Sequence, residues 1–271
     1  MKAWQIPAAE ELLKSQERWC MNACGKFLDR DSLKGQVWVM DNKRKQICAL
    51  VVYARQTLLP VLCGQPIASP HFLRHLLGMS PVHSLQGMKE DVENMEYALR
   101  KIRLYAIQSI DYDMMCIDSV PSDFRAAGPA GLIIRKPVPD DLDAFAALHA
   151  AYEQEEVLPA ASAFNPVASR FNAERIFAKE HTLVAEIGGN LIGKINTNAI
   201  AFTRLQLGGV YVHPLYRDMG IARRMTGEFV ANLVDKGMGI SLFVKKSNDP
   251  ARRVYQRIGF TSSGDYRVSY Y

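Results

Sequence analysis

Residues 208–225, GGVYVHPLYRDMGIARRM, change from a strand-like to a helix-like pattern within one short stretch. The run 210–212 is typical of a strand, and Arg217, Gly220 and Ala222 occupy the junction. The first N–H groups of a helix have no intrahelical partner and carry partial positive charge, and a glycine there lets the backbone curve closely around a phosphate. The stretch therefore predicts an anion-binding turn. Arg217 supplies either a charge for phosphates or a brace for the turn, and a tight turn into an ordinary helix is the alternative.

A second segment with chemical potential is residues 248–260, NDPARRVYQRIGF. Its helical spacing places Ala251, Val254, Tyr255 and Ile258 on one face, and glycine followed by phenylalanine ends the helix. A phenol with a pKa near 10 is a suitable proton donor to a thiolate formed in a water-poor cleft. Tyr255 is therefore a candidate general acid, and the alternative is an aromatic side chain packed on an amphipathic helix.

Together the two segments resemble the Gcn5-related N-acetyltransferase (GNAT) family. The first matches the family's R/Q-x-x-G-x-G/A loop, and the second matches its N-x-x-A-x-x-x-Y-x-x-x-G-F pattern through Asn248, Ala251, Tyr255, Gly259 and Phe260. The longer runs YEQEEV, LIGKINTNA, LGGVYVHPLYR and SLFVKKSN resemble a bacterial GNAT subgroup that carries an extra N-terminal domain of unknown function.

The resemblance implies acetyl-CoA as the acyl donor, with no metal, and a role for each matching position. Backbone groups of Val210, Tyr211 and Val212 would pair with the pantetheine arm as though it were another strand. Asn248 would contact the cofactor arm, and Tyr255 would donate a proton to the departing thiolate. The pyrophosphate would lie on the backbone amides of Arg217, Asp218, Met219, Gly220, Ile221 and Ala222.

The general base is less clearly marked. Some GNAT enzymes use a carboxylate on the strand before the pyrophosphate loop, but RLQLGGVYVH contains none. We expect Glu155 or Glu156 to serve, on the first helix of the second half, because that helix faces the acceptor cleft in the family. Glu153, Glu186 and a relay through His213 stay as alternatives, and a solvated helix end would also explain three neighbouring glutamates.

Turn-forming residues between Ser119 and Gly131 indicate a domain boundary, with an N-terminal α/β domain at 1–125 and a GNAT domain at 132–271. The second half reads β-α-α-β-β-β-α-β-α-β, a mixed central sheet of the GNAT type. Its expected strands are 132–138, 182–187, 191–200, 204–213, 240–244 and 264–271. Its expected helices begin at Pro139, near Arg170, after Gly220 and at Asp249 as N-cap, with a loop at 158–166.

The order of the expected elements in the first half roughly resembles that in the second half. The first half predicts a helix spanning residues 12–28, strands at 37–40 and 47–54 joined by the turn 41–46, a helix over 89–100, and strands at 103–110 and 111–118. A degenerate GNAT-like copy is the hypothesis. Because this half lacks the R-x-x-G-x-A loop, we expect it to wall the acceptor site or to bind a regulator instead of acetyl-CoA.

Composition excludes several classes of function. The net charge of +5 suits an anionic small ligand. The sequence contains no basic run interleaved with aromatic residues, which is the pattern that would indicate binding to nucleic acid. No apolar run reaches the roughly 18 residues of a membrane span. Neither G-x-G-x-x-G nor G-x-x-x-x-G-K-[ST] marks a dinucleotide or triphosphate loop. Five cysteines without C-x-x-C predict a reduced, cytoplasmic protein without bound metal.

The leading hypothesis is an enzyme that moves an acetyl group from acetyl-CoA to a primary amine, on a small molecule or a peptide, by direct attack in a ternary complex. The alternative is a non-catalytic acyl-CoA sensor, and a nucleic-acid-binding module is the third possibility. The sequence specifies neither the amine nor the oligomeric state.

Overall fold

The computed structural model describes residues 3–29, 36–42, 44, 46–67, 70–79, 81–121, 124, 126–158 and 163–271. Residues 43 and 45 of the predicted turn, 122, 123 and 125 of the predicted domain boundary, and 159–162 of the predicted loop lie outside this set. Within it, no helix combines the length and the apolar character needed to cross a membrane.

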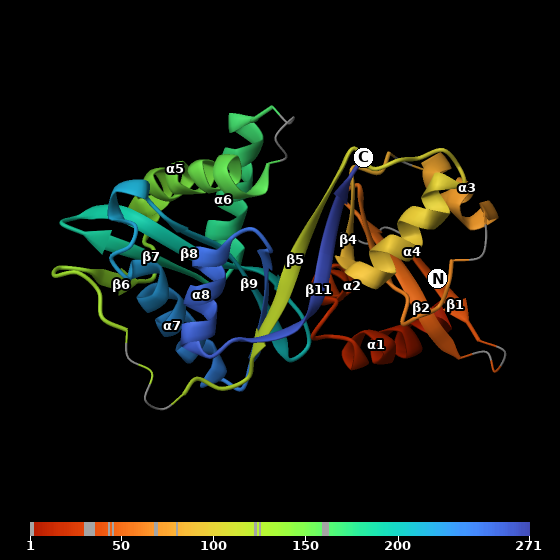
Figure 1. The fold of residues 1–271 in the computed structure, drawn as a ribbon, viewed down its shortest axis with the longest axis horizontal. Helices are drawn as coiled ribbons and strands as arrows, with labels where there is room; N and C mark the ends of the chain where they lie inside the picture. Colours follow the sequence, from red (N-terminus) through yellow and green to blue (C-terminus); the bar gives the residue numbers. More distant parts are fainter. Residues whose placement is uncertain are drawn as a thin grey trace.

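The described residues build a mixed α/β fold around one sheet of eleven strands (Figure 1). The strand order is β1-β2-β3-β4-β11-β5-β10-β9-β8-β7-β6. The strands are β1 Val37–Asp41, β2 Ile47–Ala54, β3 Thr57–Val61, β4 Ser84–Met88, β5 Gln108–Ile117, β6 Ile133–Arg135, β7 Thr182–Ile187, β8 Asn190–Ile200, β9 Arg204–Val212, β10 Gly239–Lys245 and β11 Thr261–Tyr270. The helices are α1 Ile6–Ser15, α2 Met21–Leu28, α3 Pro70–Met79, α4 Lys89–Arg100, α5 Leu142–Tyr152, α6 Pro166–Lys179, α7 Ile221–Val234 and α8 Asp249–Ile258.

The second half has the predicted element order, and its sheet carries helices on both faces. Successive strand residues point to opposite faces, so Ile195 on β8 joins the core under α7 while Lys194 faces α5. Figure 1 shows α5 and α6 on one side of these strands and α7 and α8 on the other. The sheet thus separates two helical layers, and the end of β9 lies between them.

Several predicted boundaries were wrong. The expected helix from Pro139 begins as a 3-10 turn (Pro139–Asp141), continues as α5 and ends in one turn of π-helix, Glu153–Val157. The expected helix 12–28 is two helices, α1 and α2, and the two expected strands 103–110 and 111–118 are the single strand β5. The cap of α8 is Asn248, one residue before the predicted Asp249, because the Asn248 side chain accepts the Ala251 amide.

Strands β3 and β4 were not predicted. Pro60 lies within β3, and proline normally argues against a strand because it lacks an N–H donor. β3 pairs with β4 only through Thr57 and Leu58, so Pro60 lies beyond the residues that pair with β4. Tertiary pairing with β2 explains why this sequence is extended.

The two halves exchange their last strands. β5, from the first half, lies between β10 and β11, while β11, the last strand of the chain, lies between β4 and β5. Figure 1 shows the long strands β5 and β11 running side by side where the halves meet. The sheet therefore continues without a break across the predicted boundary, and the division at 125 and 132 stays a prediction.

A buried carboxylate links the halves at a second place. Glu17, between α1 and α2, accepts hydrogen bonds from the Thr203 amide and hydroxyl, both at 2.6 Å, and from the Arg204 amide at 3.0 Å. Glu17 is only 6% exposed, and residues 203 and 204 lie at the turn into β9. The first half therefore fixes the start of the strand that leads to the site.

Candidate functional site

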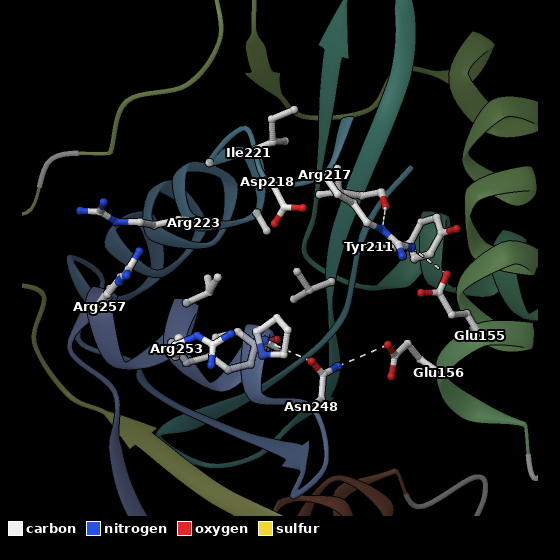
Figure 2. A pocket seen from close by; sticks show the side chains of 18 of the residues that line it. Glu155, Glu156, Tyr211, Arg217, Asp218, Ile221, Arg223, Asn248, Arg253 and Arg257 are labelled. Atoms are coloured by element: carbon white, nitrogen blue, oxygen red, sulfur yellow. Dashed lines mark hydrogen bonds and ion pairs between the residues drawn. The ribbon is translucent and has the colours of Figure 1, made fainter. Parts of the chain in front are cut away.

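A cavity of about 800 Å³ lies between the end of β9, the N-terminus of α7 and α8 (Figure 2). Every predicted site residue lines this cavity except Met219, whose side chain is exposed beside the turn. Segments more than 90 residues apart thus meet at one space. The lining residues predicted from the sequence are Glu155, Glu156, Val210, Tyr211, Val212, Arg217, Asp218, Gly220, Ile221, Ala222, Asn248 and Tyr255.

The cavity opens where two parallel strands separate. β9 and β10 pair only from Arg204–Gly239 to Gln206–Ser241, and no register pairs them beyond that point. The run 210–212 at the end of β9 therefore has β8 on one side and the cavity on the other. A strand edge of this kind offers backbone donors and acceptors to an extended ligand.

The turn between β9 and α7 has the features of an anion site. Asp218 and Gly220 both have positive φ, 62° and 79°, and Gly220 is the N-cap of α7. Gly220 has no side chain with which to cap this helix, so the N-cap residue leaves the first amides of α7 to another acceptor. A Cβ added to Gly220 would lie 3.1 Å from the Ala127 carbonyl oxygen, which further explains why glycine is present. The turn thus has the backbone conformation and the uncapped helix start of an anion-binding turn.

Arg217 braces this turn. Its Nε donates to the Val212 carbonyl at 3.1 Å, and its Nη2 lies 2.7 Å from Glu155 Oε2. The guanidinium is 5.5 Å from the centre of the Tyr211 ring. The ion pair raises the pKa of Arg217 and lowers that of Glu155. The sequence left two roles open for Arg217, a charge for phosphates or a brace for the turn. These contacts are those of a brace.

Glu156, Asn248 and Tyr255 form a group at the other end of the cavity. Asn248 uses its oxygen to cap α8 and donates its Nδ2 to Glu156 Oε1 at 3.3 Å, and Lys245 Nζ is 3.7 Å from Glu156 Oε2. Figure 2 shows the side chains of Asn248 and Glu156 pointing toward each other at the edge of the cavity. Tyr255 is buried, and this burial, followed by Tyr152 and Glu156, raises the pKa of its phenol. The phenol is therefore protonated at neutral pH.

A second cavity of about 390 Å³ adjoins the first. Both are lined by Glu156, Val210, Lys245, Asn248, Ala251 and Tyr255, so these residues mark their junction. The first half supplies part of the wall of the second cavity through Ser84 and Gln86 on β4 and Tyr112 on β5. Helix α5 supplies His149 and Tyr152, and the π-helical turn after it supplies Glu153. Helix α6 supplies Asn172 and Arg175.

Glu153, an alternative base in the sequence analysis, lies in this second wall. Burial raises the pKa of Glu153, but hydrogen bonds from His149 and Asn172 outweigh it and lower the pKa to about 2. The sequence analysis missed Lys194, which lies behind the wall and is completely buried beneath Gly209. The polar residues at every second position of β8, in the run KINTN, were the signal, because such residues face the interior only when they are hydrogen-bonded there.

No group of three or more possible metal ligands occurs among the residues the structure describes. No curated protein matches the chain. Residues 145–260 match the model of the "Acetyltransferase (GNAT) family".

Solved structures with the same fold cover nearly the whole chain. A Drosophila protein aligns over 100% of this chain and 97% of its own, with a TM-score of 0.68 and 13% identity. A GCN5-related N-acetyltransferase from Sphaerobacter thermophilus aligns over 99% and 93%, with a TM-score of 0.59 and 19% identity. A tandem GNAT protein from the clavulanic acid biosynthesis pathway aligns over 97% and 94%, with a TM-score of 0.56 and 13% identity. The structural similarity covers both halves of the chain, and what it shows is a shared fold.

Proposed function

We propose that the protein is an acetyl-CoA-dependent N-acetyltransferase acting on a primary amine, and the match of residues 145–260 to the acetyltransferase (GNAT) family model supports this proposal. The observation that carries the proposal is the junction of the two cavities. Tyr255 and Glu156 line both, so a proton donor and a carboxylate adjoin a place where two ligands can meet.

The larger cavity is the proposed donor site. The amides at the start of α7 face a pyrophosphate, and the edge of β9 at 210–212 pairs with a pantetheine arm. Arg223, Arg253 and Arg257 also line this cavity, so its electrostatic potential favours an anionic nucleotide. Asn248 is proposed to contact the cofactor arm through its position in the gap, although its side chain also caps α8.

The smaller cavity is the proposed acceptor site. The amine nitrogen attacks the thioester carbon, the C–N bond forms, and the C–S electron pair leaves with sulfur. The nitrogen releases one proton to Glu156, and Tyr255 gives its phenolic proton to the thiolate. A buried phenol with a raised pKa keeps that proton until the thiolate forms.

Of the two predicted glutamates, Glu156 is the proposed base. Glu155 is already bound to Arg217 at 2.7 Å, which lowers its pKa and its tendency to accept a proton. Glu156 lines both cavities, whereas Glu155 lines only the donor cavity. The ammonium of Lys245, at 3.7 Å, completes a polar surface around the Glu156 carboxylate.

The first half is proposed to shape the acceptor site and to bind no acetyl-CoA of its own. Ser84, Gln86 and Tyr112 line the smaller cavity, whose volume suits a small amine. In the first half, β3 and β4 form a short parallel pair like that of β9 and β10. However, a Cβ on Gly87 of β4 would lie only 3.2 Å from the Pro60 carbonyl oxygen, which indicates close backbone packing instead of a gap. The reducing cytoplasm is the proposed location, because the five cysteines are free thiols.

The first test is thermal unfolding with acetyl-CoA, with ATP and NAD as controls. A ligand at about 100 times its Kd adds roughly 2.7 kcal/mol of stability. A shift with acetyl-CoA alone supports the donor site and justifies screening amines and small peptides for release of free CoA thiol. No shift would contradict the donor site.

Tyr255→Phe then separates an enzyme from a sensor. The variant keeps the ring but loses the proton donor, so we expect turnover to fall about 100-fold or more while acetyl-CoA still stabilises the protein. A wild-type protein that binds acetyl-CoA and releases no thiol with any amine would favour a non-catalytic acyl-CoA sensor. Equal turnover in wild type and variant would remove Tyr255 from the acid role.

A further inference from the structure

Two arginines of α8 line the larger cavity without a carboxylate partner. Arg253 and Arg257 are exposed, and neither takes part in an ion pair or a hydrogen bond with any other residue that the structure describes. Because they are four residues apart on a helix, both side chains lie on one face of α8. Like charges at this spacing repel each other and destabilise a helix, so the arrangement requires an explanation.

Neighbouring arginines that lie outside the cavity are neutralised by the protein itself. On α8, Arg252 Nη1 donates to Asp113 Oδ2 at 2.9 Å, and the same guanidinium is paired with Asp249. On α7, Arg224 Nε donates to Glu228 Oε1 at 2.9 Å. Neither of these two arginines lines the larger cavity. The charges of α8 that do line it are thus left for an anion that the protein does not supply.

Helix α7 adds a third positive charge to this end of the cavity. Arg223 lies in the first turn of α7, after the N-cap Gly220, and lines the cavity. Its guanidinium is 5.7 Å from the centre of the Phe124 ring. Figure 2 shows Arg223 and Arg257 on the opposite side of the cavity from Tyr211. The positive end therefore lies beyond the start of α7, away from the edge of β9.

The chemistry of CoA supplies an anion for this position. With its pantetheine arm along residues 210–212 and its pyrophosphate on the amides at the start of α7, the adenosine end must continue past that helix start. Only the ribose separates the 3′-phosphate from the pyrophosphate, so this phosphate stays within reach of side chains that flank the turn. A phosphate monoester carries about 1.5 to 2 negative charges at neutral pH, and the planar fork of an arginine can bind two of its oxygens.

We propose that Arg253 and Arg257 bind the 3′-phosphate of CoA, so that the protein prefers CoA to 3′-dephospho-CoA. The inference rests on the proposed acetyl-CoA site. Arg223 adds to the positive potential at this end of the cavity without replacing the two arginines of α8. In the free protein the two charges on α8 repel each other, and the bound phosphate neutralises both. This accounts for a pair of like charges that the fold alone does not require.

The test is isothermal titration calorimetry of the full chain with CoA and with 3′-dephospho-CoA, which differ only in this phosphate. For the wild type we expect a Kd for CoA about tenfold lower than that for 3′-dephospho-CoA. In the double variant Arg253→Gln, Arg257→Gln the Kd for CoA should rise to that for 3′-dephospho-CoA, which should itself stay unchanged. Raising the ionic strength from about 0.05 M to about 0.5 M should reduce the preference of the wild type, because salt screens exposed charges.

The matched control is Arg252→Gln, which removes a charge from the same helix outside the cavity and should keep the wild-type preference. Arg257→Lys keeps the charge without the planar fork, so its preference should be intermediate. Equal Kd values for the two ligands in the wild type would overturn the proposal. So would a double variant that weakens both ligands equally, because the arginines would then contact another part of the nucleotide. A wild type that binds neither ligand instead refutes the proposed donor site, and this inference fails with it.

Discussion

Lys194 makes the stability of the protein depend on pH in a direction that can be calculated. Its pKa is about 7 in the folded protein, because burial disfavours the ammonium, and a lysine in the unfolded chain titrates near about 10.4. Between these values the unfolded chain binds more protons than the folded protein. The free energy of unfolding therefore rises with pH in this window, by up to about 1.4 kcal/mol per pH unit. Below about pH 7 both states are protonated and this dependence disappears.

Lys194→Met removes this titration, so the comparison of wild type and variant isolates it. A hydrogen bond with Cys24 and burial raise the pKa of Cys20, and burial raises that of Tyr152. Both shifts make the folded state less stable at high pH, but these groups are present in both proteins. From pH 7 to pH 9, the stability of the wild type relative to Lys194→Met should increase by about 2 kcal/mol.

Urea unfolding followed by tryptophan fluorescence at pH 6, 7, 8 and 9 measures this difference. It should change by less than about 0.5 kcal/mol from pH 6 to pH 7 and then rise more steeply. Ile195→Val, compared with the wild type in the same way, should show a difference that does not depend on pH, because it removes only a methyl group. A pH-independent difference for Lys194→Met would mean that the lysine has the same pKa in both states, and the reasoning from burial would be refuted.

Three further substitutions test the site and the link between the halves. Gly220→Ala should lower the free energy of unfolding by about 1–2 kcal/mol, because alanine is strained at this positive φ. It should also weaken the binding of acetyl-CoA. Unchanged binding in a thermal-shift titration would contradict the proposed anion-binding turn. Glu156→Gln should lower kcat by about 100-fold or more while the Kd for acetyl-CoA is kept, and full activity in a thiol-release assay would exclude Glu156 as the base. Glu17→Gln should cost about 2 kcal/mol in urea unfolding, because a buried charged acceptor for Thr203 and Arg204 is lost, and an unchanged midpoint would show that this contact does not hold the halves together.

Local sequence was sufficient for the order of the elements in the second half and for the turn at Gly220. Glycine at 220, proline at 250 and the apolar stripe of α7 act within one or two turns of the chain, so their effects can be read from neighbours. The same holds for the hairpin at Gly188 and Gly189, both of which have positive φ. Where a strand was missed, as at β3, pairing with another strand decided its conformation and outweighed the local preference of Pro60.

The candidate site was only partly predictable. The residue types at Arg217, Glu155 and Glu156 indicated a phosphate contact and a base, but pattern alone gave no reason to separate the two glutamates. The structure separates them, because Arg217 binds Glu155 and leaves Glu156 at the junction of the cavities.

The sequence by itself determined the mixed α/β class, the turn at Gly220 and the helix that carries Tyr255, since each depends on short-range backbone preferences. Only the tertiary structure decided that β5 and β11 change places between the halves, that Ser84, Gln86 and Tyr112 are the residues of the first half that line the second cavity, and that Lys194 lies under Gly209. These features depend on strand pairing and on the satisfaction of buried polar groups between segments far apart in the chain. Such pairings are chosen by the free energy of the whole packed sheet, which no local pattern records.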